Sequence, residues 1–176
     1  DEVTIQNTAP TITSISLTPE EPLTTDTLTC SAFGLDDGDG DLVTVGYSWW
    51  VNDTLIDATG PTLSPDSFEP GDVIACEGTP SDDVIAGEPV RSDNVQINVP
   101  PVIHSVYVSP PSPTVEDTLT CNEGSVTDAD GDPVSTRIEW FINSIASGIE
   151  TPTLSGDWFV RDDVVHCEVT PFDGAE

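Results

Sequence analysis

The sequence is short of positive charge. Its 176 residues include no lysine and only three arginines against 33 acidic residues, so the formal net charge is −30. Nucleic-acid binding depends on clustered lysine and arginine side chains, and attraction to anionic membrane surfaces depends on the same charge. We therefore expect neither nucleic acid nor an anionic membrane as a partner. The chain also has no run of 18 apolar residues, so no membrane insertion is expected.

Residues that build catalytic and zinc sites are also scarce. The two histidines, His104 and His166, are dispersed, and none of the cysteines forms a Cys-x-x-Cys pair. We therefore do not expect an enzyme. The four cysteines, in a chain with 16 prolines and 13 glycines, are suited to disulfides formed in an oxidising compartment. The chain is accordingly expected to be secreted and extracellular, at a cell surface.

The chain contains one domain twice. A shift of 91 residues superimposes Asp26–Cys30 on Asp117–Cys121, and it needs no gap between residues 10–85 and residues 101–176. Within each copy, apolar and polar residues alternate in short runs that proline and glycine separate, which is typical of β-strands. The predicted segments are an N-terminal strand at 1–9, a first domain at 10–99 and a second domain at 100–176 that lacks its own final strand.

In each copy two cysteines lie 46 residues apart with a tryptophan between them. The two sets are Cys30, Trp49 and Cys76, and Cys121, Trp140 and Cys167. A disulfide that joins two sheets and packs against a tryptophan is the immunoglobulin arrangement. We therefore predict an all-β fold of two tandem Ig-like β-sandwiches, with about seven strands and one disulfide in each. Four free buried thiols are the alternative.

An aspartate-rich loop occurs in both copies. Asp37, Asp39 and Asp41 alternate with glycine in the first copy, and Asp128, Asp130 and Asp132 occupy the equivalent positions in the second. Such oxygen ligands suit Ca²⁺, which takes six to eight of them in flexible geometry. An acidic turn without an ion is the alternative, because Asp and Gly tolerate turn dihedrals. In an Ig-type sandwich this loop shares a pole with the loop between the last two strands, so Asp82 and Asp173 are predicted as further ligands.

Five segments share a further likeness: Thr27–Cys30, Tyr47–Trp49, Cys76–Pro80, Asp128–Val134 and Val169–Gly174. They resemble the Ig-like, PKD-like and cadherin-like repeats of large prokaryotic surface proteins. The resemblance covers nearly the whole chain and implies a tandem extracellular array, in which a cation could fix the angle between consecutive domains as calcium does between cadherin repeats. It says little about function, because such repeats serve as stalks, adhesin arms and enzyme appendages.

The segment Val3–Asn7 (Val3, Thr4, Ile5, Gln6 and Asn7) resembles the predicted last strand of the first domain, Val95–Val99. Two explanations are open. The sequence is a piece cut from a longer tandem array, or subunits join head to tail by lending this strand to the open sheet edge of the next molecule. The second possibility would build an open filament.

The expected function is that of a non-catalytic structural repeat in a surface protein or extracellular filament, with Ca²⁺ at the joints and neighbouring copies of itself as partners. The alternative is an adhesin segment that binds surface glycans or proteins. Trp50 and Phe141 are expected on the outward face of a strand, where sugars could stack, although packing on the sheet is the more ordinary use of such residues.

Overall fold

The computed structural model describes residues 2–175 and is built of strands and two short 3-10 helices, with no α-helix in that range. The chain divides into two compact units, Asp1–Asn98 and Val99–Glu176. The predicted all-β fold of two β-sandwiches is confirmed. Asp1 and Glu176, which end the predicted segments 1–9 and 100–176, lie outside the described residues. No helix in the described part is both long and apolar enough to cross a membrane.

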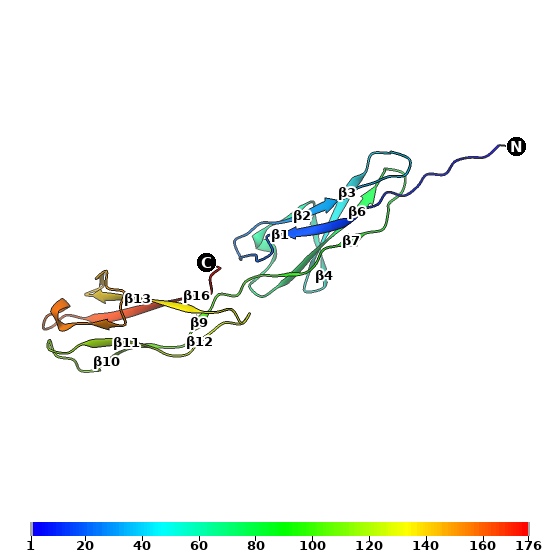
Figure 1. The fold of residues 1–176 in the computed structure, drawn as a ribbon. Coiled ribbons are helices and arrows are strands. Elements are labelled where there is room, and N and C mark those ends of the chain that lie inside the picture. The colour runs from blue at the N-terminus through cyan, green and yellow to red at the C-terminus, as the bar shows by residue number, and fades with distance from the viewer. Residues whose placement is uncertain (1, 176) are drawn as a thin grey trace. The chain divides into compact units, whose positions relative to one another are not determined.

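Unit 1 contains eight strands in two facing sheets (Figure 1). One sheet has the order β1 (Ser14–Thr18), β2 (Leu28–Phe33), β5 (Thr62–Leu63). The other has the order β4 (Thr54–Thr59), β3 (Thr44–Val51), β6 (Val73–Ser81), β7 (Val90–Arg91), and β8 (Val95–Gln96) also pairs with β6. A 3-10 helix, Pro65–Ser67, follows β5.

Unit 2 also has eight strands (Figure 1). One sheet has the order β10 (Val106–Ser109), β11 (Leu119–Glu123), β15 (Thr153–Leu154). The second has the order β14 (Ile145–Ala146), β13 (Ser135–Ile142), β16 (Val165–Phe172). The third is the small pair of β9 (Val102–Ile103) and β12 (Val126–Thr127). The 3-10 helix is Gly156–Trp158. The important difference concerns β16, the counterpart of β6. Among the described residues, β16 pairs with β13 only, so its other edge has no strand partner.

Each unit has the predicted disulfide. Cys30–Cys76 joins β2 to β6, and Cys121–Cys167 joins β11 to β16, so each bridge links the two sheets of its own unit. No cysteine is free, which removes the alternative of buried thiols. The tryptophan beside each disulfide is fully buried, and its indole N–H donates to a backbone carbonyl, from Trp49 to Gly60 at 3.0 Å and from Trp140 to Thr151 at 2.8 Å.

The two cores share six equivalent buried residues but differ at three positions. Shared are Leu28, Cys30, Trp49, Leu63, Phe68 and Cys76 of unit 1 with Leu119, Cys121, Trp140, Leu154, Phe159 and Cys167 of unit 2. Unit 1 adds Leu17, Ile74 and Ile97 to its buried core. In unit 2 the counterparts of the first two, Val108 and Val165, are only partly buried. Ile97, just after β8, has no counterpart among the described residues of unit 2.

Candidate metal sites

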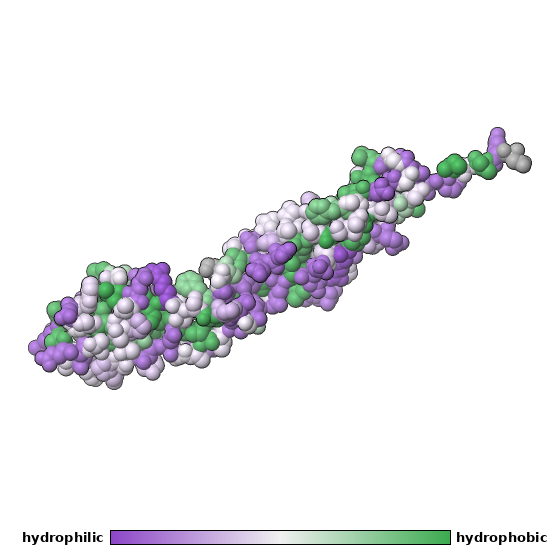
Figure 2. All heavy atoms as spheres, in the orientation of Figure 1, coloured by the Kyte–Doolittle hydropathy of each residue, from purple (hydrophilic) through white to green (hydrophobic). Residues whose placement is uncertain are grey.

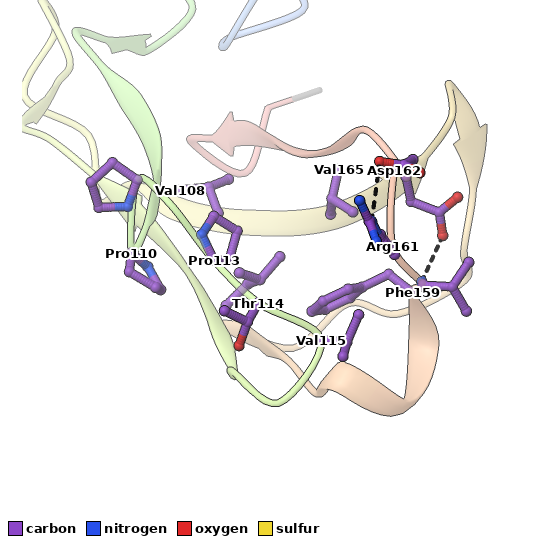
Figure 3. A pocket seen from close by; sticks show the side chains of 13 residues that line it. Val108, Pro110, Pro113, Thr114, Val115, Phe159, Arg161, Asp162 and Val165 are labelled. Atoms are coloured by element: carbon purple, nitrogen blue, oxygen red, sulfur yellow. Dashed lines mark hydrogen bonds and ion pairs between the residues drawn. The ribbon is translucent and has the colours of Figure 1, made fainter.

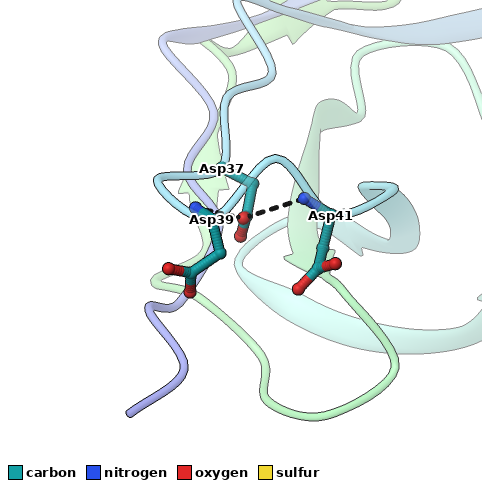
Figure 4. A group of neighbouring side chains, drawn as sticks. All are labelled: Asp37, Asp39 and Asp41. Atoms are coloured by element: carbon teal, nitrogen blue, oxygen red, sulfur yellow. Dashed lines mark hydrogen bonds between the residues drawn. The ribbon is translucent and has the colours of Figure 1, made fainter. Parts of the chain in front are cut away.

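Three aspartates of unit 1 meet in the loop between β2 and β3 (Figure 4). Carboxylate oxygens of Asp37, Asp39 and Asp41 all lie within 4.8 Å of one another. The loop closes on Asp37, whose Oδ1 accepts hydrogen bonds from the backbone N–H of Asp39 at 2.8 Å and of Asp41 at 3.1 Å. Gly40 has a φ of +81°, in the left-handed region that glycine enters at little cost. The alternation of Asp and Gly thus produces a tight loop with its carboxylates gathered together.

Unit 2 repeats this arrangement. Carboxylate oxygens of Asp128, Asp130 and Asp132 also lie within 4.8 Å of one another. Asp128 Oδ1 accepts from the N–H of Asp130, Gly131 and Asp132 at 2.9, 2.9 and 3.1 Å, and Gly131 has a φ of +86°. Two loops with different neighbouring residues therefore fold into the same acidic cluster.

The first aspartate of each loop has one oxygen that the described protein does not satisfy. Oδ2 of Asp37 and Oδ2 of Asp128 are inaccessible to solvent and have no hydrogen-bond partner among the described residues. A buried carboxylate oxygen without a partner carries a large desolvation penalty. A bound cation would remove that penalty, so these residues fit an ion with a preference for oxygen ligands.

The second aspartate of each loop holds the segment that leads into the unit. Asp39 Oδ2 accepts from the backbone N–H of Thr8 at 2.6 Å, and Asp130 Oδ2 accepts from the backbone N–H of Val99 at 2.7 Å. Thr8 and Val99 are themselves 91 residues apart. These main-chain donors were not part of the sequence prediction, although each follows an asparagine, Asn7 or Asn98, at the same position of the repeat.

The other two predicted ligands lie outside the clusters of three. Asp82 is buried, and its carboxylate is used in its own loop and by Asn7. Its Oδ1 accepts from the N–H of Val84 and Ile85, both at 2.8 Å, and its Oδ2 accepts from Asn7 Nδ2 at 2.8 Å. The hydrogen bond from Asn7, followed by that from Ile85, lowers the pKa of Asp82. Asp173 Oδ1 accepts from the N–H of Ala175 at 2.8 Å.

The segment Val3–Asn7 is not paired with any strand in the described chain. Val3 and Ile5 are 88% and 84% exposed, and Figure 2 shows apolar atoms along this extended segment. Asn7 differs from the rest because its side chain contacts Asp82. The extended part that stands clear of unit 1 is therefore Val3–Gln6.

The two aromatic residues considered for sugar stacking are covered on one face. The guanidinium of Arg91 lies 4.7 Å from the ring centroid of Trp50, and the ring of Phe141 stacks on that of His166 with centroids 5.0 Å apart. Both Trp50 and Phe141 are partly buried. A cation–π contact and ring stacking therefore occupy one face of each ring.

Comparison of the sequence with protein-family models and with curated proteins finds no match.

Proposed function

We propose that the chain is a non-catalytic structural repeat module of a secreted surface protein or extracellular filament, in which each acidic loop binds Ca²⁺ and fixes the segment leading into its β-sandwich. The observation that carries this proposal is the repeated cluster of three carboxylates, in which one buried oxygen per cluster lacks a hydrogen-bond partner among the described residues. Extracellular calcium modules bind in the range of about 10⁻⁴–10⁻³ M, which matches a secreted protein.

The three aspartates of each loop have different roles. In unit 2, Asp128 would offer its buried Oδ2 to the ion while its Oδ1 keeps the loop closed, and Asp132 would add a further carboxylate. Asp130 contributes to the cluster and also binds the N–H of Val99, the first residue of unit 2. Neutralising the cluster would remove the repulsion among its carboxylates. The loop would then hold the segment that leads into unit 2 more firmly, which is a mechanical role.

The adhesin alternative has less support. It depends on exposed aromatic faces, and Trp50 and Phe141 are partly covered by Arg91 and His166. By contrast, both acidic loops present the same chemistry in the same geometry.

Calcium binding is tested by titration calorimetry and thermal unfolding at fixed ionic strength, with Mg²⁺ as the comparison ion. We expect two Ca²⁺ sites in the unaltered chain and one after Asp128→Asn, which keeps the side-chain shape and removes the charge. Asp57→Asn, at an exposed position in β4, is the matched control and should keep both sites. At about ten times Kd, Ca²⁺ should stabilise a unit by about 1.4 kcal/mol. If chelation leaves the melting temperature unchanged and calorimetry detects no binding, the proposal is wrong.

A further inference from the structure

Unit 2 contains a groove of about 580 Å³ beside the unpaired edge of β16 (Figure 3). Its apolar walls include Val108, Phe159 and Val165 from the core side and Pro113, Val115 and Val160 toward the rim, and Thr114, Arg161, Asp162 and Asp163 also line it. Val115 and Val160 are 48% and 68% exposed. An apolar groove next to unpaired strand hydrogen-bonding groups is the combination that strand addition requires, because the edge supplies backbone pairing and the groove takes a side chain.

Unit 1 shows what fills the same place. There β8 pairs antiparallel with β6, with Val95 opposite Ile74 and Gln96 opposite Val73. Beyond β8, Ile97 is fully buried in the core, and its N–H donates to Asp72 O at 2.8 Å while its carbonyl accepts from the N–H of Gly71 at 2.9 Å. A strand with the pattern Val-x-Ile thus closes this end of the sandwich.

The residues that contact this strand in unit 1 are less buried in unit 2. Pro22, whose carbonyl accepts from Asn98 N–H at 2.9 Å, is fully buried, whereas its counterpart Pro113 is exposed. Ile74 is fully buried, whereas its counterpart Val165 is partly exposed. Unit 2 therefore presents the same surface with the covering strand missing among the described residues.

The backbone of unit 2 is already shaped for such a strand. Gly71 donates to Ile97 with a φ of +85°, and the equivalent Asp162 has a φ of +73°. The turn is the same in both units, since the N–H of Asp72 donates to Glu69 O at 3.1 Å and the N–H of Asp163 donates to Val160 O at 3.2 Å. At the rim, Val160 replaces Glu69 and Val115 replaces Thr24, whereas Arg161 replaces Pro70 and Thr114 replaces Leu23. The rim of the second groove therefore combines two exposed valines with polar and charged groups.

We propose that the edge of β16 and the adjoining groove accept Val3–Gln6 of a second copy of this chain as an added antiparallel strand. Val3 and Ile5 reproduce the Val-x-Ile spacing of Val95 and Ile97, and both are exposed and unpaired in the described chain. Ile5 fills the groove, and its N–H and C=O bind the backbone of Asp163 and Asp162. The segment carries no charge, which matters for association between chains of net charge −30.

This contact is heterologous, since the donor segment belongs to unit 1 and the acceptor groove to unit 2, so it propagates into an open filament. The inference rests on the proposed role as a structural module and names its partner, another copy of itself.

Ile5 lies five positions before Pro10, whereas Ile97 lies four before Pro101. A donated strand therefore has one more residue between the groove and the following domain than the intact repeat has.

The test compares the 176-residue chain with its Ile5→Asp variant by sedimentation over a range of concentrations. Ile5 is 84% exposed, so the substitution leaves the monomer folded. We expect concentration-dependent polymers from the unaltered chain and at least about tenfold weaker association from Ile5→Asp, given the free energy of burying one isoleucine. Ile145→Asp, a matched control at a 72% exposed position, should associate like the unaltered chain.

Hydrogen exchange locates the contact. Amides of residues 4–6 and of 161–166 should gain protection together as concentration rises, and both gains should disappear in Ile5→Asp. A chain that stays monomeric at all concentrations, or an Ile5→Asp variant that polymerises equally well, overturns the proposal. Calcium titration of the monomeric Ile5→Asp variant keeps this outcome separate from that of the acidic loops, because its two calcium sites are unaltered.

Discussion

Replacement of Ile97 by alanine is expected to destabilise unit 1 by about 3 kcal/mol. Ile97 is fully buried and belongs to the core cluster of unit 1. The substitution removes three buried carbon atoms, which at about 0.8 kcal/mol each gives a transfer term of about 2.4 kcal/mol. The cavity left behind adds to this, and measured Ile→Ala costs lie between about 2 and 5 kcal/mol.

The measurement has to report on each unit separately, because a chain of two domains does not unfold in a single two-state step. Native-state hydrogen exchange does this. Amides in β3 and β6 report on unit 1, and amides in β13 and β16 report on unit 2. Ile97→Ala should accelerate the slowest exchange of unit 1 by about a hundredfold, at 1.4 kcal/mol for each factor of ten, and leave unit 2 unchanged.

The control is Leu55→Ala in β4, where the leucine side chain is 56% exposed. It should change the stability of unit 1 by no more than about 0.5 kcal/mol. A loss of unfolding free energy below about 1 kcal/mol in Ile97→Ala would refute the reasoning, because the filled groove would then contribute little to the stability of unit 1. The equivalent groove of unit 2 would in that case offer little to a donated strand.

Two further predictions concern unit 2. Replacing Cys121 and Cys167 together by alanine should cost about 4 kcal/mol on the chain-entropy estimate for a separation of 46 residues, measured by exchange in β13; a loss under about 1 kcal/mol would contradict it. The N–H of Val160, and then the Asn143 side chain, lower the pKa of Asp163 below its ordinary 3.8. The ionised Asp163 therefore contributes its full stabilisation above pH 3.8, and this contribution is lost as the pH falls through the lower pKa of the folded state. In Asp163→Asn the free energy of unfolding should consequently fall less steeply with pH below about pH 4. A pH dependence equal to that of the unaltered chain would contradict this.

The repeat made the sandwich and its disulfides predictable. Cys30 and Cys121 follow the same Leu-Thr pair, and the buried tryptophan and second cysteine come at the same spacing in both copies. Patterns of this kind are set by burial, which leaves a clear trace in sequence. The three clustered aspartates of each loop were predictable for a related reason, because alternate acidic residues with a glycine can converge within one short turn.

Features that depend on backbone hydrogen bonds were harder to predict. Ile103–Val108 has the alternation of a single strand, but the structure divides it at His104 and Ser105. Their backbone groups bind Ser125 and Gly124 of the neighbouring segment, at 3.1 and 2.8 Å. A Cβ on Gly124 would lie 2.2 Å from Ser105 Oγ, so a larger residue there would force the serine hydroxyl to move. The glycine is visible in the sequence, whereas the segment it approaches is not.

Asp82 shows the same limit in the candidate site. Its position in the repeat placed it near the first acidic loop, but its carboxylate is committed to Val84, Ile85 and Asn7. Sequence position cannot tell whether a carboxylate faces a cation or the N–H groups of its own loop, because both environments favour the charged form. The hydrogen bonds from the N–H groups of Thr8 and Val99 could not be predicted for a similar reason. Every residue except proline carries such a donor, so the sequence does not show which donor is used.

The choice of aspartate at all three loop positions is itself an argument for a cation. Asparagine and aspartate both suit turns in which a side-chain oxygen accepts backbone N–H groups, so the turn alone does not require charge. Two like charges 4.8 Å apart repel by about 0.9 kcal/mol in water and by more where the surroundings are less polar. Both copies accept this repulsion among three carboxylates, in a chain that already has a net charge of −30. A divalent cation would convert that repulsion into attraction, and Asp37 and Asp128 each have a buried oxygen that lacks a hydrogen-bond partner among the described residues.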